Sequence, residues 1–293
     1  MQREDINIRD PFILPFEGKY YMYGTRVGNP AVEGGAWGEQ KGFDVYISDD
    51  LVDWNGPKCV FSGGNGFWGT RDFWAPEVHL WRGAFYMFAS FKAEGRCRGT
   101  HILRAESPEG PFLPMTGDPA TPLDWECLDG TFYVDRAGKP HIVFCHEWLQ
   151  VRDGTVCEAE LSEDLSRAVT EPRMLWKGSD YKGAKNAGIA DATFVTDGPF
   201  LYRTEKGELL SIWSSFSREG YEELIARSDN GEVDGNWTVD EQPLAGGNGG
   251  HGMIFRDFAG KLHFVMHQPN TSTKERPVIL SLTETETGLA LTK

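Results

Sequence analysis

Four acidic residues and one histidine stand at similar places along this chain, each at the start of a short apolar strand. They are Asp10, Glu77, Asp129, Asp197 and His251. Carboxyl groups are common proton donors and acceptors in hydrolysis, where an ionised one activates water and a protonated one releases the leaving group. An aspartate before proline or glycine is also frequent in turns, because its side chain caps nearby backbone amides. The recurrence of such residues before similar strands favours the catalytic interpretation.

Each of these strands runs into a glycine-containing turn and then into a second strand rich in aromatic and β-branched residues. This hairpin occurs five times, with its turn glycines 53 to 69 residues apart: Gly18, Gly83, Gly138, Gly207 and Gly260. A hairpin repeated at this interval is typical of β-propeller blades. The sequence therefore predicts an all-β fold, a five-bladed β-propeller. A propeller gathers the starts of its inner strands around one axis, so the acidic residues and the histidine should meet at one mouth.

The repeats run from residue 8 to residue 268 without a Ser/Gly/Pro-rich linker, so we expect a single catalytic domain over residues 1–293. The formal net charge of −15 argues against nucleic acid or an anionic membrane as partner, because both attract basic surfaces. A small neutral oligosaccharide fits this charge better. Aromatic residues make up 13% of the chain, which is enough for core packing and for stacking on sugar rings.

The sequence also bears on the compartment. No apolar window is long enough to cross a bilayer. The N-terminus, Met-Gln-Arg-Glu-Asp-Ile-Asn, lacks the apolar segment of a secretory signal. The five cysteines are odd in number and lack metal-type spacing, which favours free thiols in a reducing environment. We therefore expect a cytoplasmic protein.

Several motifs resemble those of one enzyme family. The chain is similar to glycoside hydrolase family 43 in the motifs Arg9-Asp10-Pro11-Phe12-Ile13, Trp74-Ala-Pro-Glu77, Leu128-Asp129-Gly and Gly250-His251-Gly252. This resemblance spans nearly the whole chain and implies a five-bladed propeller that inverts the anomeric configuration. It also implies that Asp10 is the catalytic base and that Asp129 orients the acid and raises its pKa.

Two residues compete for the role of general acid. The resemblance implies Asp197, in Thr196-Asp197-Gly-Pro, where the family usually has glutamate. Glu147 ends the second strand of the third repeat, which runs antiparallel to the strand that Asp129 opens, so it should emerge beside Asp129. Inverting hydrolysis needs base and acid roughly 6.5–9.5 Å apart. Glutamate is longer than aspartate by one methylene, and we therefore favour Glu147 as the acid.

Further residues near strand starts and strand ends are expected to bind the substrate. They are Arg26, Trp74, Glu77, Ser90, Trp148, Ser214 and His267. Trp74 or Trp148 could form a wall on which a sugar ring stacks. The resemblance also implies one structural calcium at the propeller axis, with His251 as a ligand. A histidine with an ordinary packing role is the alternative.

These features together predict an inverting, exo-acting glycoside hydrolase. An α-L-arabinofuranosidase comes first and a β-xylosidase second, and the short insertions between repeats favour short plant-derived oligosaccharides. A retaining β-fructosidase-like propeller is an alternative, because Glu126-Cys127 is similar to the acid motif of that group, although its nucleophile motif is missing. A non-catalytic sugar-binding propeller, which needs no paired carboxylates, is the alternative outside the enzymes.

Overall fold

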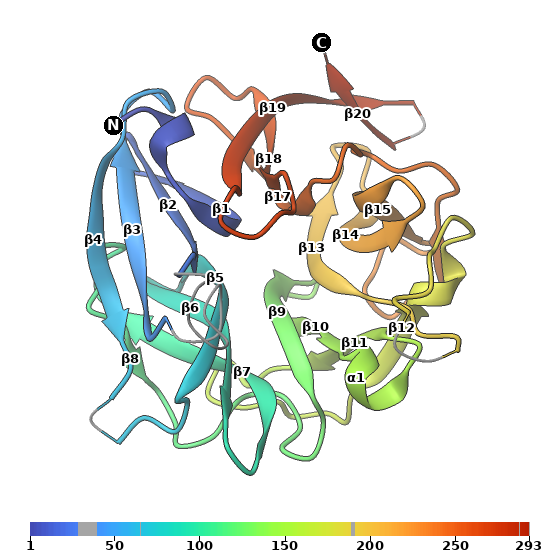
Figure 1. Cartoon of the computed structure of the whole chain (residues 1–293), viewed down its shortest axis with the longest axis horizontal. Helices are drawn as coiled ribbons and strands as arrows, with labels where there is room; N and C mark the ends of the chain where they lie inside the picture. The colour runs from blue at the N-terminus through green and yellow to red at the C-terminus, as the bar shows by residue number, and fades with distance from the viewer. Residues whose placement is uncertain (29–39, 65, 189–190, 287, 293) are drawn as a thin grey trace.

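The computed structural model describes residues 1–28, 40–64, 66–188, 191–286 and 288–292. The described residues form five four-stranded antiparallel sheets around a central axis, so the predicted five-bladed β-propeller is confirmed (Figure 1). Each sheet, or blade, consists of four strands that are consecutive in the sequence and adjacent in space.

The strands of each blade run in sequence order from the axis to the rim. Blades 1 and 2 comprise β1 (Ile8–Phe16), β2 (Lys19–Arg26), β3 (Gly42–Ser48), β4 (Asn55–Ser62), β5 (Arg71–Trp81), β6 (Ala84–Ala93), β7 (Arg96–Ala105) and β8 (Leu113–Pro114). Blade 3 comprises β9 (Cys127–Val134), β10 (Pro140–His146), β11 (Thr155–Glu160) and β12 (Arg173–Lys177). Blades 4 and 5 comprise β13 (Asp197–Arg203), β14 (Leu209–Ser217), β15 (Gly220–Ser228), β16 (Trp237–Val239), β17 (Gly250–Arg256), β18 (Leu262–Gln268), β19 (Arg276–Thr285) and β20 (Gly288–Thr292). Three short helices accompany them: η1 (Arg3–Asp5), α1 (Trp148–Val151) and η2 (Gly178–Asp180).

The two innermost strands of every blade form the predicted hairpin. All five hairpin-turn glycines have φ between +77° and +88°. This left-handed conformation is disfavoured by a side chain, because the Cβ atom approaches the following carbonyl oxygen. The backbone of the turn therefore explains why glycine recurs at this place in the sequence.

Each inner strand contains a β-bulge near its start, where its register against the second strand shifts. One residue of each bulge has a positive φ: Asp10 (52°), Ala75 (46°), Asp129 (55°), Gly198 (51°) and His251 (51°). Aspartate tolerates this conformation better than most residues, and bulges often re-aim side chains at active sites.

The bulges correct one interpretation of the sequence, in which five residues held equivalent places. Asp10, Asp129 and His251 do occupy the same position, that of the bulge residue itself. Asp197, however, lies one residue before the bulge residue of its blade, and Glu77 lies two residues after it. The side chains of Asp197 and Glu77 therefore leave the backbone at other points than those of Asp10 and Asp129.

Hydrogen bonds between neighbouring blades hold four of the bulges. The backbone N–H of the bulge residue donates to a side chain at the end of the second strand of the preceding blade. The pairs are Asp10 to Nδ1 of His267 (3.3 Å), Ala75 to Oγ1 of Thr25 (2.7 Å), Asp129 to Oγ of Ser90 (2.8 Å) and His251 to Oγ of Ser214 (2.7 Å). In blade 4 the N–H of Gly198 donates instead to Oδ2 of Asp129, at 3.0 Å. We call these five bonds the inter-blade ring.

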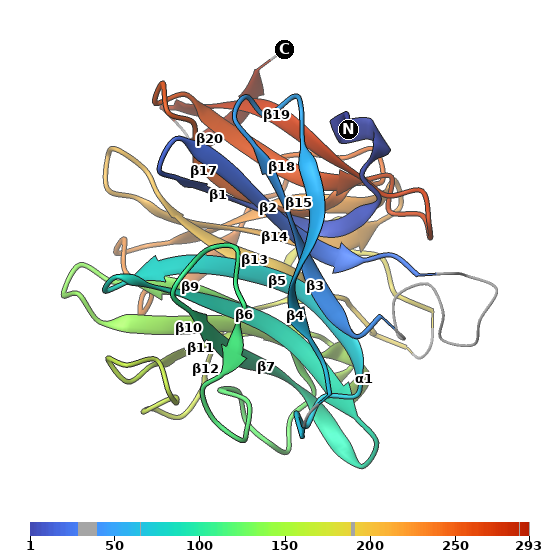
Figure 2. The same cartoon turned by 90° about the vertical axis from the view of Figure 1, so that its left-hand side faces the viewer.

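The blades pack against one another through buried apolar side chains. Between blades 1 and 2, for example, the rings of Phe43, Phe61, Phe73 and Phe91 contact one another with centroids 4.8–6.1 Å apart. The circle closes by contact of β1 with β17 and β18 (Figure 2). Among the described strands, those of the first blade and those of the last blade each form a sheet of their own.

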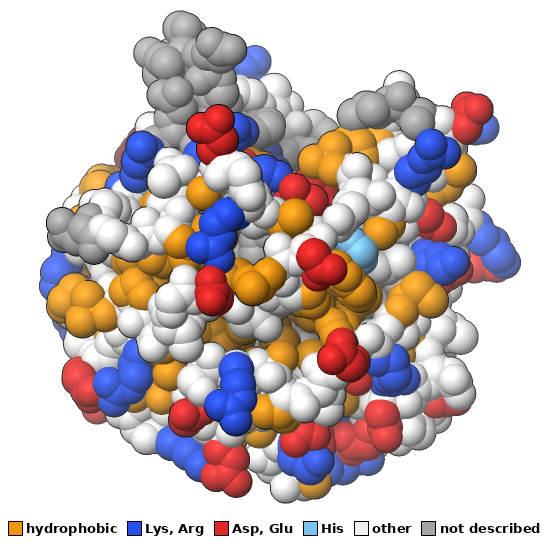
Figure 3. Space-filling view, turned by 90° about the horizontal axis from the view of Figure 1, so that it is seen from below, with side chains coloured by type: hydrophobic (Ala, Val, Ile, Leu, Met, Phe, Trp, Pro, Cys, Tyr) orange, Lys and Arg blue, Asp and Glu red, His pale blue; other side chains and the backbone are white. Residues whose placement is uncertain are grey.

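Acidic and basic side chains are interspersed on the face of the molecule that Figure 3 shows, with apolar side chains between them. None of the helices in the described part of the chain is long and apolar enough to span a bilayer.

Candidate active site

The starts of the inner strands enclose a cavity of about 180 Å³. Residues from blades 1 to 5 line it: Arg9, Asp10, Thr25, Trp74, Leu128, Asp129, Glu147, Trp148, Asp197 and His251. The cavity thus brings together the four predicted catalytic carboxyl groups, and both predicted tryptophans lie on its wall. We refer to it as the axial pocket.

Asp10 has the surroundings of an ionised carboxylate. Its Oδ2 accepts a 2.6 Å hydrogen bond from Oγ1 of Thr25, and its Oδ1 lies 3.2 Å from Nδ1 of His251. Burial raises the pKa of Asp10, but the charges of His251 and Arg9 outweigh burial, and the pKa is lowered overall. Oδ1 is buried and accepts no hydrogen bond from the described residues, although Nδ1 of His251 and Nδ1 of His267 lie within 3.4 Å of it.

Asp129 shares His251 with Asp10. Its Oδ2 lies 3.7 Å from Nδ1 of His251 and accepts the N–H of Gly198. Burial, joined by the charges of Asp197 and Asp10, raises the pKa of Asp129 to about 7 despite His251. Burial lowers the pKa of His251, but the surrounding carboxylates outweigh it and raise that pKa to about 9. Asp129 therefore holds its proton more readily than Asp10 does.

Asp197 and Glu147 also have raised pKa values, but their partners differ. Burial raises the pKa of Asp197 against the charge of His251 and a 2.9 Å hydrogen bond donated by the hydroxyl of Tyr221. Burial raises the pKa of Glu147 against Arg98, whose Nε lies 3.3 Å from Oε2 of the glutamate. Both carboxyl groups therefore hold a proton more readily than an ordinary carboxyl group does, which suits a proton donor.

The charged groups of the pocket fall into two clusters. The axial cluster comprises Asp10, Asp129, Asp197 and His251, in which the histidine acts on all three aspartates. Glu147 belongs to a second cluster, on the wall between blades 2 and 3, with Arg98 and Asp72. An ionised carboxylate and a protonated one in the same small pocket are what hydrolysis by direct displacement needs.

Comparison with known proteins decides the family. The family model of Glycosyl hydrolases family 43 matches residues 5–287. The chain belongs to this family. It is therefore a glycoside hydrolase of an inverting family, and the retaining fructosidase-like alternative is not supported.

Relatives with solved structures share the fold of this family 43 chain. An endo-arabinase from Bacteroides thetaiotaomicron VPI-5482 is 36% identical, with 98% of both chains covered and a TM-score of 0.88. An α-L-arabinofuranosidase from Lactobacillus brevis is 17% identical, with 99% of this chain and 97% of that one covered and a TM-score of 0.74.

One curated relative is also similar. The extracellular exo-α-(1→5)-L-arabinofuranosidase ArbA of Cellvibrio japonicus (strain Ueda107) is 22% identical over 250 residues. The match covers 77% of this chain and 65% of that relative, so the chain spans less than two thirds of its length.

Three of the predicted substrate-binding residues hold the backbone of the family 43 pocket instead of facing its cavity. Ser90, Ser214 and His267 are fully buried and take part in the inter-blade ring. Burial and the charge of Arg9 lower the pKa of His267 to about 3, so its ring is neutral. In a neutral ring, Nδ1 of His267 can accept a hydrogen bond from the backbone N–H of Asp10.

Arg26 and Glu77 lie outside the described lining of the pocket. Nε of Arg26 donates to Asp44 on β3 at 2.7 Å. Oε2 of Glu77 accepts a 2.6 Å hydrogen bond from Thr131 and lies 3.0 Å from Nε2 of His79. The structure thus gives both residues protein partners, and a contact of either with substrate remains a prediction.

Several residues of the site were not predicted. Arg9 lines the pocket, and its place beside Asp10 in the Arg-Asp-Pro motif could have indicated this. Arg98 and Tyr221 lie on β7 and β15, the third strands of their blades, where the sequence shows only ordinary alternation. Arg98 reaches Glu147 of the next blade, whereas Tyr221 reaches Asp197 across its own blade.

The arrangement around His251 bears on the predicted calcium. Within the described residues, no group of three or more His, Cys, Asp or Glu side chains could hold a metal ion. Nδ1 of His251 faces Asp10, and a raised pKa keeps the ring protonated, whereas a metal ligand must be neutral. These residues therefore fit an imidazolium better than a calcium ligand. The calcium remains a prediction, which the melting temperature with chelator and with added calcium would test.

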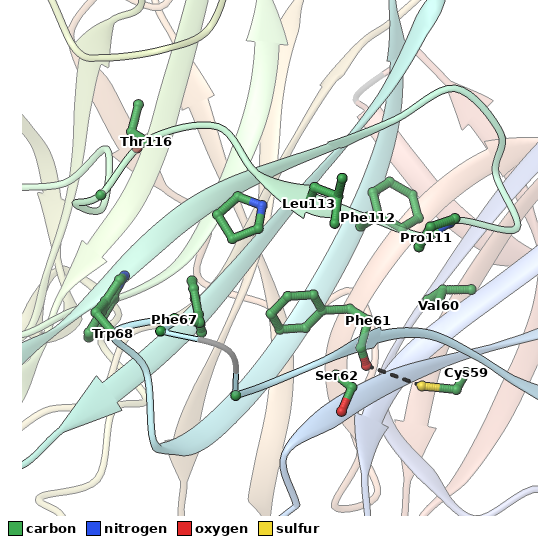
Figure 4. Close-up of a pocket in the computed structure, with 14 residues that line it drawn as sticks. Cys59, Val60, Phe61, Ser62, Phe67, Trp68, Pro111, Phe112, Leu113 and Thr116 are labelled. Carbon is green, nitrogen blue, oxygen red and sulfur yellow. Dashed lines mark hydrogen bonds between the residues drawn. The ribbon is translucent and has the colours of Figure 1, made fainter.

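A larger cavity, of about 510 Å³, lies between the outer strands of blades 1 and 2 (Figure 4). Its labelled wall is largely apolar and includes Phe61, Phe67, Trp68, Phe112 and Leu113. None of the described residues that line it is charged. This cavity therefore lacks the carboxyl groups that hydrolysis requires, despite its greater volume.

Proposed function

We propose that this family 43 enzyme is an exo-acting α-L-arabinofuranosidase that hydrolyses short neutral oligosaccharides with inversion. The observation that carries the proposal is the pairing, in one small pocket, of Asp10, whose pKa is lowered, with a buried carboxyl group on another wall, whose pKa is raised. A protein that only binds sugars has no need of this difference.

The reaction assigns one step to each carboxyl group. Asp10 takes a proton from a water molecule at Oδ1 as the water oxygen attacks the anomeric carbon. The bond between that carbon and the glycosidic oxygen breaks, and the general acid gives this oxygen its proton, so that an alcohol leaves. His251 and Arg9 keep Asp10 ionised, and Asp129, which shares His251 with it, orients the acid.

We assign the general acid to Glu147. Asp197 belongs to the axial cluster, next to the base and with its Oδ2 engaged by Tyr221. It is also shorter by one methylene, roughly 1.5 Å, and a misplacement of about 1 Å can cost a hundredfold in rate. Glu147 approaches from a separate wall, as a donor opposite the attacking water must. Asp197 then accepts a hydrogen bond from a hydroxyl group of the bound sugar.

Size and similarity support the exo action and the sugar. A cavity of about 180 Å³ is smaller than the roughly 300–1,000 Å³ of common ligand pockets, and it suits one sugar ring. The names of similar proteins include two arabinofuranosidases. Endo action on arabinan is the second candidate, because the relative at 36% identity is named an endo-arabinase.

One experiment tests both the activity and its mode. Nitrophenyl α-L-arabinofuranoside, nitrophenyl β-xyloside and a set of arabino-oligosaccharides are incubated with the enzyme, and early products are separated by size. We expect free arabinose as the first product, and proton NMR should show its anomer inverted. Early release of oligosaccharides would support the endo candidate, whereas binding without hydrolysis would support a sugar-binding propeller.

We also propose a single catalytic domain over residues 1–293 in the cytoplasm. All five cysteines are free, and three of them are buried, which suits a reducing compartment. The relative ArbA is named extracellular, so the location needs its own test. Thiol titration of the unreduced, denatured protein from its native host should find five free thiols, and a stable disulfide would contradict the proposal.

A further inference from the structure

Arg98 is buried behind the wall of the axial pocket and contacts two residues that line it. Its side chain is only 4% exposed. The guanidinium carbon lies 3.8 Å from the ring centroid of Trp74, and Nε lies 3.3 Å from Oε2 of Glu147. One cation from blade 2 thus touches both an aromatic wall of the pocket and the carboxyl group assigned as proton donor.

Asp72 balances the charge of Arg98. It lies on β5, its side chain is 3% exposed, and its Oδ2 is 3.0 Å from Nη1 of Arg98. The same oxygen lies 3.3 Å from Nε of Arg71 at the surface. A buried guanidinium without a partner is strongly destabilising. Asp72 supplies that partner, so the ionisation of Glu147 is not needed to balance Arg98.

We propose that Arg98, balanced by Asp72, is a positioning residue that holds Glu147 in the orientation of a proton donor and fixes Trp74 beside it. This inference rests on the proposed function, since it assumes that Glu147 is the acid.

The geometry explains how a cation can orient an acid that must stay protonated. The N–H of Arg98 engages only Oε2 of Glu147. A carboxylic acid that carries its proton on Oε1 can still accept a hydrogen bond at Oε2. Oε1 is then the atom that delivers the proton. Asp72 opposes the positive potential of Arg98, which alone would favour the carboxylate.

Other charges also face Glu147 and enter any pH effect. Asp197 at the start of β13 and Glu126 just before β9 both favour its protonated form. Glu126 is itself paired with Lys92 on β6, at 2.7 Å. Asp129 lies on the wall of the same pocket. These groups are the same in wild type and in variants of Asp72 or Arg98. A difference between the pH profiles of wild type and such a variant therefore comes from the pair of Arg98 and Asp72.

The first test changes Asp72→Asn. Asparagine tolerates the positive φ of 54° at this position. Loss of the carboxylate leaves the charge of Arg98 unopposed, which favours ionised Glu147. We expect the alkaline limb of the kcat/KM profile for a natural disaccharide to move to lower pH by on the order of one unit. A purely structural role would lower the amount of folded enzyme and leave the limb in place.

The second test changes Arg98→Lys, which keeps the charge but loses the planar fork and the stacking on Trp74. A misaligned acid harms poor leaving groups most. We expect kcat for the disaccharide to fall about tenfold or more relative to a dinitrophenyl glycoside, with the alkaline limb unchanged.

The chain offers matched controls on the same strand. Arg96 stacks over Trp68 at 4.7 Å and pairs with Asp118 at 2.7 Å, as Arg98 does with Trp74 and Asp72. Arg96 and Asp118 lie at the surface, and neither is among the described residues that line the axial pocket. Arg96→Lys and Asp118→Asn should leave the alkaline limb of the kcat/KM profile as in wild type. They should also leave the ratio of kcat for the disaccharide to kcat for the dinitrophenyl glycoside unchanged.

The outcomes separate this inference from the function beneath it. Suppose that Glu147→Gln spares the activated substrate while the Asp72 and Arg98 variants behave like the Asp118 and Arg96 variants. Then Glu147 is the general acid, but the positioning role of Arg98 is wrong. If Glu147→Gln loses both substrates in proportion, the acid assignment fails and this inference fails with it. Absence of hydrolysis in wild type would overturn the proposed function itself.

Discussion

Asp10 and Asp129 show how one type of side chain takes two protonation states in a single pocket. Both are buried bulge residues beside His251. Asp10 also has Arg9 and the hydroxyl of Thr25, which favour its carboxylate. Among the groups that act most strongly on Asp129 in the described part of the chain, His251 is the one cation, and Asp197 and Asp10 favour the acid form. The difference comes from neighbours and not from burial, which is similar for the two.

Replacing Asp10 with asparagine removes the carboxylate proposed to accept the proton of water, because an amide oxygen is not basic enough for this step. Asp10→Asn should lower kcat by several orders of magnitude, because a general base contributes about 10²–10⁴-fold and orientation adds to this. Asparagine also tolerates φ of 52°, so the fold should persist. Steady-state kinetics and circular dichroism check the two statements. Activity above about a tenth of wild type would show that another group is the base.

The acid can be identified by leaving-group dependence. Glu147→Gln should nearly abolish cleavage of a natural disaccharide and leave much of the cleavage of a dinitrophenyl glycoside, which departs without a proton. Asp197→Asn should weaken both in proportion, because it removes a contact with the sugar. The ratio of kcat/KM for the two substrates gives the answer. The reverse pattern would assign the acid to Asp197.

The bulge is the element that decides where a side chain of the inner strand points. The hairpin pattern of the sequence predicted the blades, since strand alternation and turn glycines are local signals. The register of the bulge was not predicted, because one extra residue in a strand leaves no mark in composition. For this reason Asp197 and Glu77 were placed as equivalents of Asp10, although they lie one residue before and two residues after the bulge residue.

The rest of the site depends on contacts between distant segments. Arg98 lies 49 residues from Glu147, and Tyr221 lies 24 residues from Asp197. Neither pair has a spacing that indicates contact. The first contact depends on the packing of blades 2 and 3, and the second on the position of β15 relative to β13 within blade 4. The predicted carboxylates could be found because each follows a recurring motif. Their partners could not, because one arginine or tyrosine on an outer strand looks like any other.

Gly198 tests the bulge of blade 4. A Cβ atom at this position would lie 2.6 Å from Cδ2 of His251, at a φ of +51°. Gly198→Ala should therefore displace the ring of His251 from Asp10 and lower kcat/KM at least tenfold. Gly260→Ala is the control, because it has a φ of +83° with nothing within 4 Å. Both variants should lose about 1–2 kcal/mol of stability to backbone strain. Equal activity in the two would show that His251 does not require this space.

The whole molecule is closed by side chains at the junction of blades 1 and 5. Glu275, just before β19, is fully buried, and its Oε1 lies 3.2 Å from Nη1 of Arg9. The same guanidinium donates to Oδ1 of Asn270 at 2.7 Å. Arg9 also lines the axial pocket. Closure of the propeller and the charge balance of the active site thus depend on the same arginine.

Removing this carboxylate should destabilise the closed circle. Glu275→Gln removes the fully buried carboxylate that faces Arg9, and breaking a buried ion pair costs about 3–5 kcal/mol. The free energy of unfolding from urea denaturation measures the loss. Glu205→Gln is the control, because Glu205 is 75% exposed and pairs with Arg256 at the surface. Its loss should stay below about 1 kcal/mol. Similar losses of unfolding free energy in the two variants would show that the pair of Arg9 and Glu275 does not stabilise the closed circle.

The inter-blade ring has a consequence for amide exchange with solvent. The N–H groups of Asp10, Ala75, Asp129 and His251 are each bound by a side chain of the preceding blade. Their protons can exchange when the junction between two blades opens and these hydrogen bonds break. These four amides therefore report on individual junctions of the circle. In two of them the reporter is the backbone of an aspartate that lines the axial pocket, so the exchange rate of Asp10 or Asp129 measures how often the pocket itself opens.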